Sequence, residues 1–423
     1  MASQSAINKT ILPNGVRLLS ERVPYVDSVS VGVWIEAGAR DEEANQLGTS
    51  HFLEHMLFKG TQTRSARQIA DEMDSLGGQL NAFTDKEFTC YYARVLGEHL
   101  PKALDVISDM VLNSVFDPVE ISREKNVVLE EIKRHEDTPE DEVHDLLAQT
   151  LWKGHKLGNA VIGNRAVVGA MTRDDLLLYM ETFYRPDALV IAAAGNVDHV
   201  AFVDLVSAAF GDLKGNRPSR SAIPVEPHLT ACLKDKSTEQ IHFCLGTAGF
   251  PQHSQDKYAL AAVDSILGGG MSSRLFQEIR ESRGLAYAVG SYSASYSEAG
   301  LFAIYGGTSV DNVRTVVELT HKECENMGRD SVTDDELQRA KNQIRGALVL
   351  GQESMSNRMS RLAKSELYFG RIIRMEEILG AIMRVTKEDV ASVASRLFQG
   401  SRFAVSAIGP FKEHANLLEG VFA

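Results

Sequence analysis

Cysteine is scarce in this 423-residue chain. None of the four cysteines belongs to a C-x-x-C pair, and they lie well apart from one another, at Cys90, Cys232, Cys244 and Cys324. This spacing argues against both a disulfide framework and a zinc site made of thiolates. We expect reduced thiols, most of them buried.

The chain also lacks a long apolar run and an excess of positive charge. No stretch approaches the roughly 18 apolar residues of a membrane-spanning helix, so we expect no membrane partner. Its 44 Lys and Arg are outnumbered by 57 Asp and Glu, and the formal net charge of −13 argues against a nucleic-acid partner. The stretch 1–12 has neither the apolar segment of a secretory signal nor the Arg-rich pattern of an organelle presequence. We therefore expect a cytoplasmic protein, or a mitochondrial matrix protein if a presequence has been removed.

The length of the chain is sufficient for two domains of about 200 residues each. The segment 216–228 contains three prolines and several polar residues, which is typical of a linker. We therefore divide the chain into an N-terminal domain at 1–215, this linker, and a C-terminal domain at 229–423.

The two halves match one another at a nearly constant offset, which indicates an internal duplication. Met171–Leu176 aligns with Val385–Val390, and each segment places a Thr before acidic residues, as at the start of a helix. Val190–Gly195 aligns with Ala404–Gly409, and each is a short apolar strand ending at a glycine. The pattern predicts an α+β fold with two homologous sandwich domains, each a sheet packed with helices.

Two local patterns predict strands in the N-terminal half. The pair Asn14-Gly15 is typical of a tight turn between two strands. The segment Phe83–Val95 is rich in Phe, Thr and Tyr and predicts a single strand.

A short helix near the N-terminus carries the strongest chemical motif. Gly48–Phe58 combines a start typical of a helix with apolar residues at helical spacing. His51 and His55 are then one turn apart on the same face, so both imidazoles can reach a single metal ion. Glu54 shares that face and can reach a water molecule on the ion without being a ligand.

A tetrahedral catalytic zinc needs a third protein ligand, and a carboxylate from elsewhere is the obvious candidate. The predicted helix Val119–His135 offers Glu124, Glu130 and Glu131. Glu124 and Glu131 are seven residues apart and share a face, whereas Glu130 points about a quarter-turn away. The spacing alone leaves the choice between Glu124 and Glu131 open.

Simpler explanations compete with a metal site. A lone histidine on a helix is usually a satisfied core or surface residue, and a row of carboxylates is usually a solvated face. The complete H-x-x-E-H motif is much rarer by chance than either. The duplication adds a second argument, because the C-terminal copy has Ala261, Asp264 and Ser265 in place of His51, Glu54 and His55, in that order. We therefore expect the N-terminal copy to carry the chemistry.

Several motifs occur in a fixed order along nearly the whole chain, at His51–Thr61, Gly78–Ala82, Glu124–Ile132 and Arg280–Tyr287. With them the chain resembles the inverzincin metallopeptidases of the insulinase and pitrilysin type, in particular the mitochondrial-processing-peptidase-like branch and its bacterial homologues. The resemblance implies a bacterial protein whose two domains form a half-clamp. Two such half-clamps would enclose a chamber in which an unfolded peptide is cut.

The resemblance also implies roles for the residues of the metal site. His51, His55 and Glu131 would bind one zinc ion per chain, and Glu54 would be the catalytic base that activates water. Glu124 matches a carboxylate that orients a ligand histidine or tunes the site. A plain surface acid is the alternative for Glu124.

Other matched positions imply contacts with substrate. Asn81 and Ala82 match an edge strand that pairs with the substrate backbone. Arg280 and Tyr287 match a pair in the C-terminal domain that reaches the substrate carbonyl beside zinc. Core packing is the alternative for Tyr287.

Three further matched positions also have structural alternatives. Phe58 matches a position that lines the pocket after the scissile bond, but an aromatic at helical spacing is as often part of the core. Asp141 and Asp145 match acids that select an arginine near the cut, but a solvated helix face would look the same.

These observations predict a zinc-dependent endopeptidase that cleaves unfolded peptides or presequence-like segments, including ones that contain arginine. The expected assembly is a homodimer, or a heterodimer with an inactive homologue. The main alternative is a non-catalytic or partner-dependent structural subunit of the same fold, although such subunits typically lose the ligands that this chain retains. Another metal-dependent hydrolase is a lesser alternative.

Overall fold

The computed structural model describes residues 6–220, 225–329, 332–398, 400, 402–415 and 420–422. The chain divides into two compact units. Unit 1 comprises Met1–Lys133, Asn159–Ser221 and Leu350–Ile373, and unit 2 comprises Arg134–Gly158, Ala222–Val349 and Arg374–Ala423. Each unit therefore takes one segment from the other half of the sequence. Of the predicted linker, residues 221–224 lie outside the described residues.

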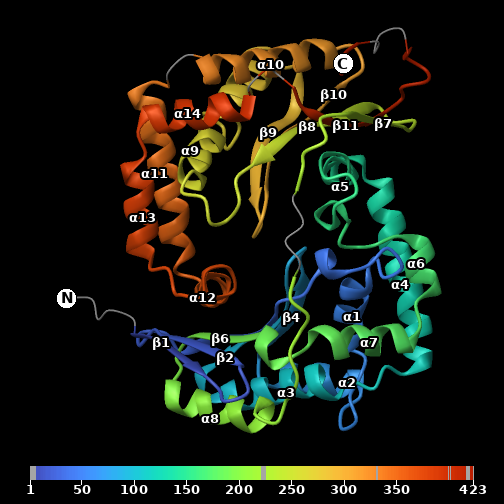
Figure 1. The fold of residues 1–423 in the computed structure, drawn as a ribbon, viewed down its shortest axis with the longest axis vertical. Coiled ribbons are helices and arrows are strands. Elements are labelled where there is room, and N and C mark those ends of the chain that lie inside the picture. The colour runs from blue at the N-terminus through green and yellow to red at the C-terminus, as the bar shows by residue number, and fades with distance from the viewer. Residues whose placement is uncertain are drawn as a thin grey trace. The chain divides into compact units, whose positions relative to one another are not determined.

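Unit 1 is built on a six-stranded mixed sheet with the order β1-β2-β6-β3-β5-β4 (Figure 1). The strands are β1 Ala6–Ile11, β2 Arg17–Arg22, β3 Ser28–Ile35, β4 Gln79–Thr84, β5 Thr89–Leu96 and β6 Leu189–Gly195. β2 and β6 are parallel, and the other neighbouring strands are antiparallel. β4 forms one edge of this sheet as described.

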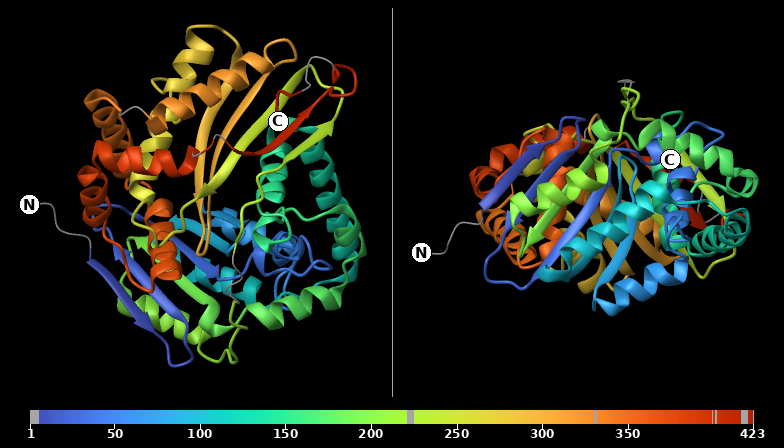
Figure 2. Two further views of the ribbon diagram at one scale, coloured as in Figure 1. Left: turned by 45° about the horizontal axis from the view of Figure 1, so that its top comes forward. Right: turned by 90° about the horizontal axis from the view of Figure 1, so that it is seen from below.

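Helices cover both faces of this sheet (Figures 1 and 2). α3 (Leu100–Asn113) and α8 (His199–Phe210) pack against one face, and α12 (Met355–Phe369) packs against the other. Alternate residues of β6 enter two separate hydrophobic cores, because a strand covered on both sides is buried along its whole length. The other helices of unit 1 are α1 Thr49–Leu57, α2 Ala66–Ser75, most of α4 Pro118–Asp137, α6 Arg165–Ala170 and α7 Arg173–Phe183, with short turns η1 Ala39–Asp41, η2 Gly97–His99 and η4 Pro186–Ala188.

Unit 2 is built on a five-stranded sheet with the order β7-β11-β8-β10-β9. Its strands are β7 Ala231–Asp235, β8 Gln240–Gly249, β9 Ala286–Ser295, β10 Gly300–Ser309 and β11 Ala404–Gly409. α5 (Pro139–Leu151) packs on one face of the sheet, and the main core of unit 2 lies on the other face (Figure 2). The remaining elements are η3 Lys156–Gly158, α9 Lys257–Leu267, the π-helical turn η5 Phe276–Glu281, α10 Val313–Arg329, α11 Asp334–Gly351, α13 Met375–Arg384 and α14 Lys387–Phe398.

The two sheets share one topology, as an internal duplication requires. If β1 is left aside, the order β2-β6-β3-β5-β4 of unit 1 corresponds strand by strand to β7-β11-β8-β10-β9 of unit 2. The one parallel pair falls at the same place in both sheets, between β2 and β6 and between β7 and β11. The predicted α+β fold of two homologous sheet-and-helix sandwiches is confirmed.

The local predictions have mixed outcomes. The turn at Asn14-Gly15 does join two antiparallel strands, β1 and β2. The single strand predicted over Phe83–Val95 is wrong, because the chain reverses between β4 and β5. The amide of Asp85 donates to the carbonyl of Phe88, which closes this turn.

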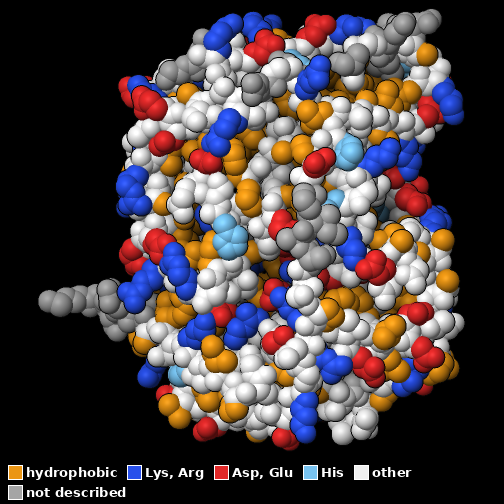
Figure 3. Space-filling model, viewed as in Figure 1, with side chains coloured by type: hydrophobic (Ala, Val, Ile, Leu, Met, Phe, Trp, Pro, Cys, Tyr) orange, Lys and Arg blue, Asp and Glu red, His pale blue; other side chains and the backbone are white. Residues whose placement is uncertain are grey.

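On the face shown in Figure 3, acidic and basic side chains are interspersed with apolar ones, and no large region carries charge of a single sign. Within the described part of the chain, we find no helix with the length and apolarity needed to cross a membrane.

Candidate metal centre

A buried carboxylate binds the N-terminal end of helix α1. Its first residues follow Gly48, whose positive φ of 91° favours glycine, and whose Cβ position would come within 3.0 Å of Gly163. Glu42 takes the place of a capping side chain: its carboxylate accepts hydrogen bonds from the Gly48 amide (2.7 Å), the Ser50 amide (2.8 Å) and the Ser50 hydroxyl (2.5 Å). Burial raises the pKa of Glu42 to about 7, although these hydrogen bonds oppose the shift. The helix is thereby fixed at its N-terminal end.

His51, His55 and Glu131 lie together at the meeting of α1 and α4. The Nε2 atoms of His51 and His55 are 3.8 Å and 3.6 Å from Oε2 of Glu131. One potential ligand atom from each side chain lies within 4.8 Å of the other two. Ligands of a tetrahedral zinc, each at about 2.0–2.1 Å, are about 3.4 Å apart, so small shifts would accommodate the ion. Among the described residues, this is the one cluster of its kind.

The charge states of the two histidines differ. Burial, together with the nearby His55, lowers the pKa of His51 to about 4, so its imidazole is neutral near pH 7. Its buried Nδ1 has no hydrogen-bond partner among the described residues. Burial alone would lower the pKa of His55, but the hydrogen bond to Glu124 and the charges of three carboxylates outweigh it and raise that pKa. A raised pKa favours the protonated form of His55. A metal cation bound in the cluster would favour the unprotonated form instead, because the nitrogen that binds a metal cannot carry a proton.

Glu54 lies on the same helix but outside the three-residue cluster. Its Oε2 accepts a hydrogen bond of 2.5 Å from the hydroxyl of Thr84, the last residue of β4. Burial raises the pKa of Glu54, and the hydrogen bond from Thr84 opposes that rise. A half-buried carboxylate held in this way has the properties of a general base.

Glu124 contacts His55 from the side opposite Glu131. Its Oε1 is 2.9 Å from Nδ1 of His55, and its Oε2 is 2.7 Å from Nζ of Lys59. Burial would raise the pKa of Glu124, but the hydrogen bonds to His55 and Lys59 outweigh burial and lower it. The structure thus separates the two carboxylates that the sequence left open, because Glu131 faces Nε2 of both histidines and Glu124 faces only Nδ1 of His55.

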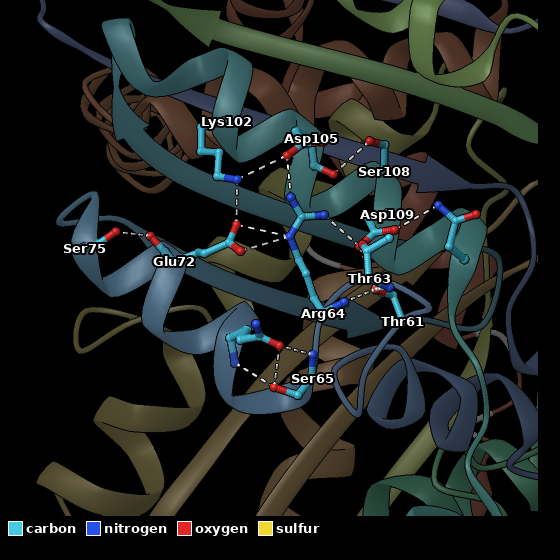
Figure 4. Close-up of polar contacts among 12 residues, drawn as sticks. Thr61, Thr63, Arg64, Ser65, Glu72, Ser75, Lys102, Asp105, Ser108 and Asp109 are labelled. Carbon is cyan, nitrogen blue, oxygen red and sulfur yellow. Dashed lines mark hydrogen bonds and ion pairs between the residues drawn. The ribbon is translucent and has the colours of Figure 1, made fainter.

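The segment after α1 is anchored by a charged network (Figure 4). Arg64 lies at its centre and pairs with Glu72 (3.1 Å), Asp105 (2.5 Å) and Asp109 (2.7 Å). The hydroxyl of Thr61 donates to the same Asp109 oxygen at 2.7 Å. The backbone that follows Lys59 is therefore tied to α2 and α3.

Three residues of this site were not predicted from the sequence: Glu42, Lys59 and Thr84. For Lys59 a signal exists, because it follows His55 by one helical turn and both can reach one carboxylate. Glu42 precedes the helix by several residues of irregular chain, and Thr84 ends a strand whose boundary was predicted wrongly. Neither of these positions has a local pattern that marks it.

Of the predicted substrate residues, three lie in unit 1. Asn81 is exposed and Ala82 is half-buried, and both belong to the edge strand β4. Phe58 follows the last residue of α1 and packs against the core of unit 1, with its ring centroid 6.5 Å from that of Tyr91. This contact is the packing arrangement that was the alternative for Phe58.

The other four predicted residues lie in unit 2. The guanidinium of Arg280 stacks on the ring of Tyr287, 4.6 Å from its centroid, and donates to the Tyr287 carbonyl at 2.9 Å. Tyr287 is 77% exposed, so core packing does not account for it. Asp141 is exposed on α5, whereas Asp145 on the same helix pairs with His135 at 3.4 Å.

Comparison with known families decides which group the chain belongs to. The family described as Insulinase (Peptidase family M16) matches residues 17–165, and the family described as Peptidase M16 inactive domain matches residues 170–344. A protein of Bacillus subtilis named as an uncharacterized zinc protease is 43% identical over 404 residues, which are 96% of this chain and 98% of that protein. The chain belongs to peptidase family M16, the insulinase family. The two matched regions of this M16 chain correspond to the half with the metal cluster and the half without it.

Other relatives extend the comparison. A Mycobacterium tuberculosis protein, also named as an uncharacterized zinc protease, is 43% identical over 416 residues, covering 97% of this chain and 94% of its own. The fold resembles a peptidase M16 inactive domain from Pseudomonas fluorescens, with a TM-score of 0.89, 20% identity, and coverage of 96% and 98% of the two chains. It also resembles a protease from Helicobacter pylori, with a TM-score of 0.88, 21% identity, and coverage of 96% and 100%. These bacterial relatives agree with the predicted insulinase-type family.

Proposed function

We propose that this M16 chain is a zinc-dependent endopeptidase that cleaves unfolded peptides. The observation that carries the proposal is the arrangement of His51, His55 and Glu131 around one point, with Glu54 beside them on the same helix. The donor set of two imidazole nitrogens and one carboxylate suits zinc, and the named zinc proteases among its relatives support the same metal.

In this proposal His51, His55 and Glu131 bind one zinc ion per chain. When bound there, zinc would lower the pKa of a water molecule and polarise a peptide carbonyl. Glu54 accepts the proton from the attacking water and delivers it to the leaving amine. Thr84 keeps the carboxylate of Glu54 in one orientation during both transfers. Glu124 accepts a hydrogen bond from the Nδ1–H of His55, which leaves Nε2 unprotonated and free to bind the metal.

The exposed edge of unit 1 supports a peptide substrate. β4 carries Asn81 and Ala82, and an extended peptide can add to such an edge through main-chain hydrogen bonds. Recognition of main chain tolerates varied side chains, which suits an enzyme acting on unfolded segments. The end of β4 also carries Thr84, so the strand that would bind substrate contacts the proposed base directly.

Unit 2 supplies further candidates for substrate recognition. Arg280 and the exposed ring of Tyr287 are proposed to stabilise the oxyanion and to position the peptide. Asp141 and Asp145 are proposed to favour arginine near the cut.

In unit 1, Phe58 is proposed to form part of the pocket after the scissile bond. The active assembly is proposed to be a homodimer, or a heterodimer with an inactive homologue.

The proposal is tested by comparing the purified wild type with Glu54→Gln. We expect about one zinc per chain in both proteins, cleavage of unstructured peptides by the wild type, and a loss of about 10²–10⁴-fold in the variant. Peptides with and without arginine near the cut test Asp141 and Asp145, and esters offered alongside test the hydrolase alternative. Wild type without zinc would overturn the proposal. Wild type that binds zinc but cleaves no peptide, even after homologous M16 proteins from the same organism are added as partner subunits, would favour a structural subunit.

A further inference from the structure

We propose that Lys59 is a positioning residue of the metal site: it holds Glu124, and Glu124 in turn holds His55. This inference rests on the proposed zinc site and adds a residue to it. The relevant contacts form one chain, from Lys59 Nζ to Glu124 Oε2 at 2.7 Å and from Glu124 Oε1 to His55 Nδ1 at 2.9 Å. In this chain of contacts, the ammonium group of Lys59 reaches His55 only through Glu124.

Each oxygen of Glu124 has a separate task. Oε1 accepts a hydrogen bond from the imidazole of His55 and so orients it, and Oε2 accepts a hydrogen bond from the ammonium group of Lys59. The Glu124 side chain is only 6% exposed, so water has little access to an oxygen that loses its partner. Two contacts on opposite oxygens also fix the rotation of the carboxylate, which a single contact would leave free.

The position of Lys59 is set by its neighbours in the chain. Its amide donates to the carbonyl of Met56 at 3.0 Å, which continues the last turn of α1. Two residues later, Thr61 is fixed by Asp109 in the network around Arg64 (Figure 4). The lysine side chain therefore leaves a backbone that is held on both sides, and it reaches Glu124 on α4 from a defined direction.

Loss of the ammonium group should loosen His55 and not the fold as a whole. Without Lys59, Oε2 of Glu124 is left in a nearly buried place without a charged partner, and the carboxylate can turn away from His55. Outer partners of metal ligands typically change metal affinity by about 10–100-fold. Because Lys59 acts through Glu124, we expect its effect at the lower end, about tenfold weaker zinc binding.

Zinc affinity of Lys59→Met is the direct test, measured by competition with a zinc-binding dye. Lys59→Arg should restore affinity to within about threefold of the wild type, because it keeps a charged donor for Oε2. Lys133→Met is the matched control. This variant also removes one lysine charge, but from α4, where Lys133 is 55% exposed and pairs with Glu130, so zinc binding should not change. Melting of the zinc-free proteins shows whether each variant is folded, and Lys59→Gln replaces the methionine variant if that one is not.

A double-mutant cycle with Glu124→Gln separates positioning from a general effect on structure. If Lys59 acts through Glu124, adding Lys59→Met to Glu124→Gln should cause little further loss of zinc affinity. Additive losses, or a Lys59→Met protein with wild-type affinity, would overturn the role of Lys59 while leaving the zinc site in place. A wild type that binds no zinc would instead overturn the proposed function, and the inference with it.

Discussion

The hydroxyl of Thr84 donates a 2.5 Å hydrogen bond to the carboxylate of Glu54. This contact joins α1, which carries the proposed base, to the end of the edge strand β4. The strand that we propose for substrate binding and the residue that we propose for proton transfer are thus in direct contact. A peptide that adds to β4 would be placed relative to the base without any intervening loop.

Thr84→Val should lower the rate of peptide cleavage and move its acid limb to higher pH. The hydrogen bond from Thr84 lowers the pKa of Glu54, so its removal lets burial raise that pKa further. The basic form of Glu54 is then populated only at higher pH. We expect a loss of about tenfold in kcat near neutral pH, which is less than the roughly 10²–10⁴-fold contribution of a proton-transfer group, because Glu54 itself is retained. The measurement is a pH profile of kcat, with zinc content determined in parallel.

Thr182→Val is the matched control for Thr84→Val. Its hydroxyl donates to the Leu178 carbonyl within α7 and not to Glu54. Its pH profile should match that of the wild type. An unshifted acid limb in Thr84→Val would show that Thr84 does not tune Glu54.

Zinc binding should weaken in mild acid because of His55. The hydrogen bond and charges around His55 outweigh its burial and raise its pKa above 6.5 in the metal-free protein, whereas the pKa of His51 is about 4. Between about pH 4 and 6.5 one proton on His55 therefore competes with zinc, and affinity should fall by about tenfold per pH unit. Dye competition at a series of pH values measures this. An affinity independent of pH across that range would contradict the assignment of His55 as a ligand.

The histidine pair of the candidate metal site, and the helix face that carries the carboxylates, could be predicted from sequence because their geometry is local. One helical turn separates His51 from His55, and two turns separate Glu124 from Glu131, so helical periodicity alone places each pair on a face. Periodicity could not tell which carboxylate faces the metal, since that depends on how α4 lies against α1. The distances to Nε2 and Nδ1 of His55 make the distinction.

The sequence pattern did not predict to which unit α5 and α12 belong. Each helix has an apolar face, but such a face does not specify which sheet it covers. α5 lies in the N-terminal half of the sequence but packs on the sheet of unit 2, while α12 lies in the C-terminal half and packs on the sheet of unit 1. Contacts between residues far apart in the chain decide such cases, and a single sequence does not contain them.

Arg64→Met should destabilise unit 1 measurably. Arg64 is 12% exposed and binds three carboxylates, so its loss leaves Asp109 nearly buried with fewer partners (Figure 4). Asp109 keeps its hydrogen bonds from Thr61, Thr63 and Asn113, which limits the expected cost to about 1–2 kcal/mol. Urea unfolding of the zinc-free protein gives the free energy of unfolding.

Arg67→Met is the control for Arg64→Met. Arg67 pairs with Asp71 at 3.4 Å, but both side chains are largely exposed, and such pairs contribute about 0–1 kcal/mol. A change in Arg64→Met no larger than that in the control would mean that the network is not important for stability.

Glu42→Gln should flatten the dependence of stability on pH. Burial raises the pKa of Glu42 from 4.5 to about 7, so the folded protein binds this proton more tightly than the unfolded chain does. The stabilising contribution is therefore complete below pH 4.5 and is lost as the pH rises to about 7, a change of about 3 kcal/mol for a shift of this size. Urea unfolding of the zinc-free wild type and variant at pH 5, 6, 7 and 8 measures the slope. Glutamine also disturbs the acceptors for Gly48 and Ser50, so the absolute stability can fall at every pH, and only the slope tests the titration. A variant as pH-dependent as the wild type would show that another group titrates in this range.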